Sequence, residues 1–459
     1  METTSRRADI DDLRARLSGR VVTPDEADWD RARQAWNLVP DQRPAAVAFP
    51  ESAADVVAVV DVARERGLHV APQATGHFAL ALGSLEDTIL MKTSRMRGAE
   101  IDAERQRARV EAGAQWIDVT VPAAQHGLAA LAGTAPDVGI VGYTLGGGLG
   151  WLGRKRGLAA NSVLAADVVT ADGRLRRVDA DEEPELFWAL RGGGGSFGVV
   201  TALEFRLFPV RELYAGDLFW PFERASDILH AWREWSATVP DELTSLGRLL
   251  QLPSIPDIPE PFRGRSFVLV EAAYLGKEAD GQELLRPLRE HAPEIDTVAM
   301  IQPPGLAALH MDPPQPVAGL GDGALLNALP PEAVDALVAV AGPGSGSPLL
   351  SVELRSLGGA LAEALPEHGA VGAIDGAFAM FAAGFTMDAA AARLVEEAVE
   401  RVRDALAPWE TARTFFNFTE HPVESHGLYP EETVSRLRRI KAEVDPGELF
   451  RVCHPVAPA

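Results

Sequence analysis

The sequence predicts an α+β protein built from a glycine-rich N-terminal part and a central part in which helices cover an antiparallel sheet. Three observations support this prediction. A strand–helix–strand pattern occupies residues 44–72, dense glycine clusters follow at 142–153 and 192–198, and after Pro209 strands and helices continue without such clusters. A chain of 459 residues is long enough for two or three domains.

The first elements form the strand–helix–strand unit. We expect strands at 44–49 and 69–72, with a helix between them that Ser52 caps and Gly67 ends. Such a unit is typical of parallel strand pairing. The small and glycine-containing residues 73–85 then predict a loop.

The remaining elements divide at residue 209. Before it, the patterns predict strands at 88–92, 99–102, 107–112 and 199–207, a hairpin of 163–170 with 175–178, and helices at 116–126 and 183–190. After it, they predict strands at 214–222, 267–274, 349–354, 377–385 and 415–419, helices at 225–239, 281–291, 331–340, 389–406 and 429–444, and a Pro/Gly-rich loop at 303–323.

Composition excludes several classes of protein. The net charge of -23 argues against a nucleic-acid partner, because phosphate binding requires clustered Lys and Arg. The single cysteine, Cys453, allows no internal disulfide and no zinc cluster, so we expect no metal site. Residues 1–20 lack an apolar core, and no stretch of 18 apolar residues predicts a membrane span. We therefore expect a cytoplasmic enzyme without a membrane partner.

The three glycine-containing clusters are the candidate ligand-binding segments. They are Thr75-Gly76-His77, 142–153 (GYTLGGGLGWLG) and 192–198 (GGGGSFG), and each borders a predicted strand. Glycine is unfavourable in regular structure, so dense clusters mark positive φ or close approach of a ligand. Each cluster could offer backbone N–H groups to a pyrophosphate or to the edge of a flavin, although tight turns alone would also explain them.

Better-known motifs fit these clusters poorly. Residues 148–153 match GxGxxG, but only about nine residues separate Gly153 from the next strand, which leaves no room for the helix of a nicotinamide-binding fold. Residues 194–198 match GxSxG, but a helix precedes them and a strand follows, the reverse of a nucleophile elbow. A nicotinamide site and a serine hydrolase are therefore disfavoured.

Four segments, in this order, resemble FAD-linked oxidases of the vanillyl-alcohol oxidase superfamily, most closely the berberine-bridge-enzyme-like group. They are 72–79 (PQATGHFA), 137–163, 185–207 and 445–450 (DPGELF), with a looser match at 351–361. The resemblance implies a PCMH-type FAD-binding domain of two subdomains, formed by residues 1–212 and the C-terminal segment 412–459. It further implies an α+β substrate domain at 213–411 whose antiparallel sheet lies over the flavin.

The resemblance also implies roles for individual residues. His77 occupies the place of a histidine that bonds the flavin covalently, and Ala135 replaces the cysteine of relatives with a second bond, so the link should be single. Val138 matches a position that influences oxygen access. The implied FAD contacts are Gln73, Ala74, Thr75, Gly76, His77, Phe78, Pro136, Asp137, Val138, Gly139, Gly142, Tyr143, Gly146, Gly147, Gly148, Gly150, Trp151, Asn161, Gly198, Val199, Val200 and Asn417.

The resemblance implies oxidation of an alcohol, sugar or amine by hydride transfer to the flavin, with O2 as the electron acceptor. Such a reaction usually needs a base. Segment 415–419 has phenylalanines where several relatives have tyrosines, so we expect Glu353 as the base, with Tyr143 and Asn417 as further catalytic candidates. Arg355 and His310 are the expected substrate-binding residues, and His421 is a lesser candidate base.

Two alternatives stay open. Glu353 and Arg355 share one face of a strand, so they could form a purely structural salt bridge. The protein could then be a flavin-binding protein with altered chemistry, or a dehydrogenase that uses an acceptor other than O2.

Overall fold

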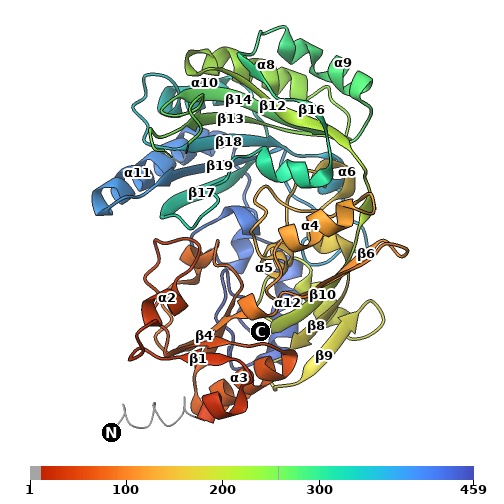
Figure 1. Cartoon of the computed structure of the whole chain (residues 1–459), viewed down its shortest axis with the longest axis vertical. Helices are drawn as coiled ribbons and strands as arrows, with labels where there is room; N and C mark the ends of the chain where they lie inside the picture. The colour runs from red at the N-terminus through yellow and green to blue at the C-terminus, as the bar shows by residue number, and fades with distance from the viewer. Residues whose placement is uncertain (1–11, 257) are drawn as a thin grey trace.

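The computed structural model describes residues 12–256 and 258–459, and it has the predicted α+β architecture. Figure 1 shows a large sheet flanked by helices in its upper part and smaller sheets with shorter helices below it. The two parts meet along the face of the large sheet that the helices leave uncovered, and this face lies over the loops of the lower part.

The first small sheet contains four strands in the order β1-β2-β4-β3. Both β2 and β3 run parallel to β4, so the predicted strand–helix–strand unit is correct, but its two strands are not neighbours because β4 lies between them. Helix α3 starts where Ser52 Oγ accepts from the Asp55 amide and ends at Gly67 in the left-handed region. The bounds are β1 Arg20–Val22, β2 Ala46–Phe49, α3 Ala53–Arg66, β3 His69–Gln73 and β4 Thr88–Lys92, with α2 at Trp29–Arg33.

The second sheet has five antiparallel strands in the order β5-β6-β10-β8-β9, which include the predicted hairpin of β8 and β9. Short helices connect these strands. The bounds are β5 Ala99–Asp102, β6 Arg107–Glu111, α4 Ile117–Ala124, α5 Ile140–Leu145, α6 Gly153–Arg156, β8 Val163–Val169, β9 Leu175–Asp179, α7 Pro184–Leu190 and β10 Val199–Arg206. A small ladder joins β7 Leu128–Ala129 to β11 Phe208–Pro209.

The third sheet has eight strands in the order β15-β12-β14-β13-β18-β19-β17, with β16 also paired to β12, and all its pairings are antiparallel. Four of its strands were not predicted: β13 Leu243–Gln251, β15 Ile295–Asp296, β16 Ala299–Ile301 and β17 Gly319–Leu326, which begins within the expected loop 303–323. The predicted strands are β12 Leu213–Pro221, β14 Ser266–Tyr274, β18 Ser351–Ser356 and β19 Phe378–Phe385. The covering helices are α8 Ala225–Ser236, α9 Glu278–Arg289, α10 Pro331–Ala341 and α11 Ala389–Leu406.

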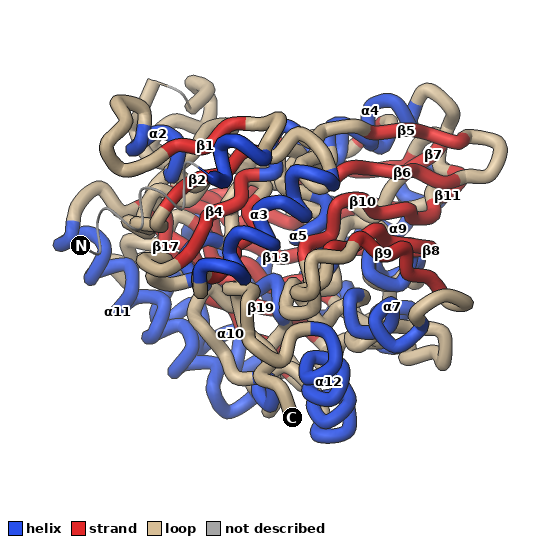
Figure 2. Tube along the Cα trace, turned by 90° about the horizontal axis from the view of Figure 1, so that it is seen from below, coloured by secondary structure: helices blue, strands red, loops and turns tan. Residues whose placement is uncertain are grey.

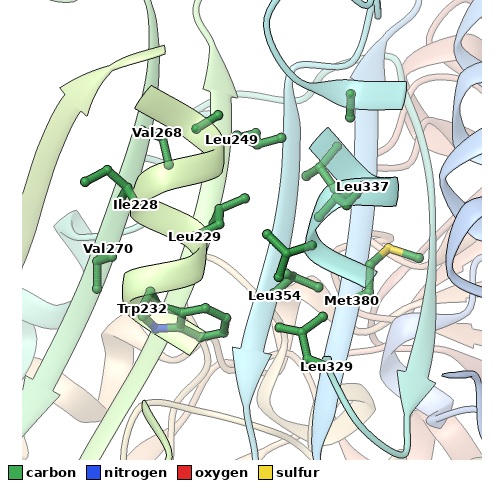
Figure 3. Packing of buried hydrophobic residues seen from close by; sticks show 14 of the residues in the cluster. Ile228, Leu229, Trp232, Leu249, Val268, Val270, Leu329, Leu337, Leu354 and Met380 are labelled. Atoms are coloured by element: carbon green, nitrogen blue, oxygen red, sulfur yellow. The ribbon is translucent and has the colours of Figure 1, made fainter. Parts of the chain in front are cut away.

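The helices bury one face of this sheet. Figure 3 shows Leu229 and Trp232 of α8 and Leu337 of α10 packed onto strand residues such as Leu249 and Leu354, in one continuous apolar cluster. Side chains alternate along a strand, so the neighbours of Leu249 and Leu354 point to the opposite face. That opposite face carries the polar residues of the candidate site.

The C-terminal segment returns to the lower part. Helix α12 (Glu431–Val444) was predicted and lies beside α7, as Figure 2 shows. At its C-terminal end, Lys441 and Asp445 form a buried ion pair with 2.5 Å between Nζ and Oδ2, and Asp445 also accepts from the Leu449 amide. Asp445 is the first residue of the DPGELF motif, and these contacts give it a structural role: its carboxylate ends helix α12 and holds the turn that follows.

The predicted strand at 415–419 is wrong, because Phe416–Phe418 form a single 3-10 turn. The turn places the Asn417 side chain against the lower part, where it accepts from the Gly148 amide and donates to the Tyr143 carbonyl. Among the described residues, no helix is both long enough and apolar enough to cross a membrane.

Candidate functional site

One large cavity lies between the uncovered face of the eight-stranded sheet and the loops of the lower part. Its volume is about 1170 Å³, and it is lined by the loop after β3, by parts of 133–149 and 194–200, and by residues of β13, β18 and β19. Ordinary small-molecule sites span about 300–1,000 Å³. The cavity is therefore large enough for a dinucleotide cofactor together with a small substrate.

The loop after β3 presents a row of backbone amides to this cavity. Residues 73–78 all line it, and Gly76 adopts a φ of +88° that lets the loop turn. Among the described residues, none accepts a hydrogen bond from the amides of 74–78. Successive free amides in a turn form a concave anion-binding nest. The loop therefore fits the diphosphate of FAD, as the resemblance implied.

The His77 ring is fixed at the wall of the cavity by two neighbours. The Trp36 ring stacks on it with 4.0 Å between centroids, and His77 Nε2 lies 3.3 Å from Asp137 Oδ1. Trp36 Nε1 donates to the other oxygen of Asp137 at 2.7 Å. Burial opposes ionisation of Asp137, but the contacts with His77 and Trp36 outweigh it and lower its pKa. Sequence reasoning missed Trp36, which lies far from Asp137 along the chain.

The predicted FAD contacts divide into two groups. Those that line the cavity are Gln73, Ala74, Thr75, Gly76, His77, Phe78, Val138, Gly139, Gly142, Tyr143, Gly198, Val199, Val200 and Asn417. Those outside the lining are Pro136, Asp137, Gly146, Gly147, Gly148, Gly150, Trp151 and Asn161. Of the run 142–148 that was expected to lie along the flavin, Gly142, Tyr143 and Leu145 line the cavity, and contact of FAD with the remaining glycines stays a prediction.

Glycines 146–150 serve close packing within the chain. A Cβ on Gly148 would lie 2.4 Å from the Tyr143 ring, and one on Gly150 would lie 1.9 Å from the Ala132 carbonyl oxygen. Trp151 is buried in an apolar cluster, and the Asn161 side chain bonds the backbone at Gly369 and Gly372. These residues shape the wall and do not form its surface.

Two polar residues of β18, Glu353 and Arg355, meet His310 of the loop before β17 at the cavity. Glu353 on β18 forms an ion pair with Arg355 at 2.8 Å, and its Oε2 lies 3.0 Å from His310 Nε2. Burial opposes ionisation of Glu353, but the charges of Arg355 and His310 outweigh it and lower its pKa below the usual range. Burial and Arg248 oppose protonation of His310, but Glu271 and Glu353 raise its pKa to about 9. Glu353 is therefore a carboxylate at neutral pH, and His310 is a cation.

A second set of charges stands behind these residues, and sequence reasoning missed it. Glu271 on β14 is fully buried and contacts His310 Nδ1 at 2.8 Å and Arg248 of β13 at 3.0 Å. Asp217 lies opposite Glu271 in the strand register. Burial and the neighbouring Glu271 raise the pKa of Asp217 to about 8. Charged residues within predicted strands, such as Asp217 and Glu271, could have indicated this network. Their partner Arg248 could not, because strand β13 was not predicted.

Three other candidates have less suitable surroundings. The Tyr143 hydroxyl donates to the Leu131 carbonyl at 3.2 Å, and burial raises its pKa well above the usual range, so it is a poor base. Asn417 ties the Tyr143 and Gly148 backbones together at the cavity wall. His421 is half exposed, pairs with Asp322 at 3.2 Å and lies outside the lining.

Glu420 is a cavity-lining carboxyl that was not predicted. Its Oε2 accepts from the Gly321 amide at 3.1 Å, and burial raises its pKa to about 8. Glu420 lies only three positions after Asn417 in the sequence, and this proximity could have identified it as a candidate. The GxSxG serine, by contrast, is 1% exposed and its Oγ accepts from the Val456 amide, so it is structural.

The outer part of the cavity is apolar. Leu250, Leu252, Ile255 and Phe262 line it from β13 and the segment that follows. The predicted rim loop 303–323 contributes residues 310–315. A substrate that enters past these side chains meets hydrocarbon before it reaches the charged groups around Glu353.

Comparison with known proteins agrees with this arrangement. Residues 44–179 match the FAD binding domain family. The uncharacterized FAD-linked oxidoreductase YgaK of Bacillus subtilis (strain 168) is 26% identical over 457 residues, 97% of this chain and 98% of that protein.

Solved structures show the same fold. The 6-hydroxy-D-nicotine oxidase from Arthrobacter nicotinovorans matches with a TM-score of 0.82 and 26% identity, over 96% of this chain and 98% of that chain. The wild-type BBE-like 1 protein of Physcomitrella patens matches with a TM-score of 0.83 at 20% identity, over 98% of this chain and 100% of that chain. Residues 44–179 are therefore similar to an FAD binding domain, the chain is similar over nearly its whole length to FAD-linked oxidoreductases, and its fold is that of the berberine-bridge-enzyme-like proteins.

Proposed function

We propose that the protein is an FAD-dependent oxidase that removes a hydride from an alcohol, sugar or amine-type small molecule. One observation supports this most strongly. A single cavity joins the amide-lined loop and His77 to the carboxylate of Glu353. A cofactor that fills the inner part would therefore lie beside a charged group able to accept the proton of a substrate.

In this proposal, residues 1–212 and 412–459 form the FAD-binding domain and residues 213–411 form the substrate domain. The shared apolar core of the lower part supports the division, because Leu437 and Ile440 of α12 belong to the same cluster as Val110 and Leu203. The cavity between the two parts is the usual place for a ligand site.

His77 would be the only covalent anchor of the flavin. It lines the cavity beside Trp36, where its ring is held in one orientation. Ala135 also lines the cavity and has no thiol to form a second bond. The amides of 74–78 would bind the diphosphate, so the cofactor would be held both by hydrogen bonds and by one covalent bond.

Bound FAD would supply the electron chemistry, since it accepts a hydride from the substrate carbon and passes two electrons to O2, which leaves as H2O2. The chain would supply the rest. Glu353 would take the proton of the substrate hydroxyl or amine. Arg355 and the His310 cation keep Glu353 ionised and would orient a polar group of the substrate.

Val138 supports O2 as the acceptor through the family resemblance, and it lines the cavity at the start of α5. A cytoplasmic location is part of the proposal, because the single cysteine requires no oxidising compartment. The apolar outer cavity favours a substrate with a hydrocarbon body over a long polar oligosaccharide.

A second candidate follows from the charge pairing of Glu353. Both carboxylate oxygens of Glu353 have ion-pair partners, so Glu353 could stabilise the fold without acting as a base. The protein would then bind flavin without oxidase chemistry. Alternatively, it could pass electrons to an acceptor other than O2. Anaerobic mixing with a panel of small alcohols, sugars and amines separates the cases. Bleaching of the 450 nm band followed by H2O2 formation in air supports the oxidase. Bleaching without H2O2 indicates a dehydrogenase, and a yellow protein that never bleaches indicates flavin binding alone.

A further inference from the structure

Lys92 is a buried lysine at the carboxyl end of β4. It pairs in parallel register with Gln73, the last residue of β3, so both lie at the edge of the sheet from which the amide-lined loop starts. Ligands in sheets with parallel strands bind at the carboxyl ends of the strands. The Lys92 residue is only 7% exposed.

The amine has hydrogen-bond partners but no negative charge beside it. Lys92 Nζ donates to Gln73 Oε1 at 2.5 Å and to the Gln34 carbonyl at 2.7 Å. Within the described ranges, no carboxylate lies at ion-pair distance from Lys92. Burial alone lowers its pKa to about 8. A buried cation without an opposite charge is unfavourable, so its place beneath an anion-binding loop calls for an explanation.

Gln73 connects this amine to the loop. Its side chain lines the cavity and lies directly under Gly76, where an added Cβ would be 3.0 Å from Gln73 Cδ. The charged groups of the neighbouring segments pair among themselves. These pairs are Arg33 with Asp41, Asp137 with His77, and Arg95 with Glu51. These pairs leave the Lys92 ammonium to Gln73 and the Gln34 carbonyl, and the Gln73 side chain links it to the loop.

We propose that Lys92 is the buried counter-charge of the FAD diphosphate, positioned by Gln73 behind amides 74–78, and that FAD binding is coupled to protonation of Lys92. The inference rests on FAD binding by this loop. An ammonium group in a protein interior acts over several ångström, because the surrounding dielectric is low. The diphosphate would favour the charged form of Lys92, as an opposite charge does for any amine.

The coupling has a defined sign. Below pH 8 the amine is already protonated in the free protein, so binding takes up no proton there. Above pH 8 the free protein loses this proton, and FAD must restore it. The dissociation constant for FAD should therefore rise by up to about tenfold per pH unit above pH 8, and it should be flat from pH 6.5 to 7.5.

The test uses apoprotein of the His77→Ala variant, in which FAD binding is reversible. FAD is titrated from pH 6.5 to 10 and followed by quenching of its fluorescence, with riboflavin, which lacks the diphosphate, as a second ligand. Lys92→Met removes the charge, Lys92→Gln keeps a hydrogen-bond donor for Gln73, and Lys277→Met makes the same change at an exposed residue of the substrate domain.

We expect the alkaline rise for FAD in the His77→Ala parent and in Lys277→Met, and a flat profile for riboflavin. Lys92→Met and Lys92→Gln should both bind FAD at least about tenfold more weakly at pH 7, without the alkaline rise. Parent-like FAD binding by Lys92→Gln at every pH would overturn the proposal, since Lys92 would then act only as a hydrogen-bond donor. An equal alkaline rise for riboflavin would also overturn it.

If the Lys92 variants do not fold, calorimetry of the His77→Ala protein at pH 8.5 in two buffers of different ionisation enthalpy decides. Net proton uptake with FAD but not with riboflavin supports the coupling, and equal uptake with both ligands, or none with FAD, contradicts it. A protein that binds neither ligand at any pH would instead refute the proposed function.

Discussion

Replacing Glu353 with Gln tests the role of the charged cluster in the chemistry. Glu353 is 2% exposed and compensates two cations, Arg355 at 2.8 Å and His310 at 3.0 Å. At an effective dielectric constant of about 20, one such pair is worth about 4 kcal/mol. Breaking a buried pair from one side usually costs about 3–5 kcal/mol, so Glu353→Gln should lower the free energy of unfolding by that amount.

Glu353→Gln should also slow the reaction, because it removes the group proposed to act as the base. A positioned base contributes about 10²–10⁴-fold to the rate, which corresponds to about 3–5 kcal/mol of barrier. Glu353→Gln should therefore slow flavin reduction by about 10²–10⁴-fold in anaerobic stopped-flow experiments, with any substrate that bleaches the parent. Its spectrum and its flavin content should not change.

Glu271→Gln is the matched control. Glu271 belongs to the same network and is fully buried, but it does not line the cavity. We expect a comparable loss in urea-unfolding free energy, with the rate of flavin reduction within about tenfold of the parent. Parent-like reduction by Glu353→Gln would refute the role of Glu353 as base. An equally large loss of rate in Glu271→Gln would show that the network supports structure and not proton transfer.

Three further predictions concern other parts of the molecule. Asn417→Ala should remove the bonds to the Tyr143 and Gly148 backbones and lower stability by about 1–3 kcal/mol, measurable by thermal unfolding of the apoprotein. Lys441→Met should leave Asp445 buried and unpaired and cost about 3–5 kcal/mol in urea unfolding, whereas a loss below about 1 kcal/mol would contradict the account. Since burial raises the pKa of Glu420 to about 8, the native apoprotein retains this proton while the unfolded chain loses it above pH 5. Stability from this group should fall by up to about 1.4 kcal/mol per pH unit between pH 5 and 8, and Glu420→Gln should remove that part of the slope.

The elements that the sequence predicted correctly are those whose signals are local. The helix from Ser52 to Gly67 has a side-chain cap and a left-handed end within its own sequence, and both operate in the structure. Strand β13 was missed because Gly247 and Arg248 interrupt its apolar pattern. Arg248 is buried there only because Glu271, on another strand, faces it, and such a partner cannot be identified from the strand itself.

The candidate site was predicted in part for the same reason. Loop 73–78 was singled out by its glycine-containing motif and the family resemblance, and Glu353 by its place on a predicted strand, whereas Trp36 contacts Asp137 across 101 residues. The glycines at 146–150 were interpreted as ligand contacts, but the Tyr143 ring occupies the space beside Gly148. A glycine cluster shows that something approaches closely, and it does not tell whether that is a ligand or the chain itself.

Acid precipitation of the purified protein, followed by an absorbance spectrum of the pellet and the supernatant, tests whether the protein holds FAD through His77. We expect a yellow protein with a band near 450 nm whose flavin stays with the pellet, and a His77→Ala variant that releases FAD into the supernatant. A colourless protein without that band, whose apoprotein also fails to bind added FAD, would refute FAD binding by this chain.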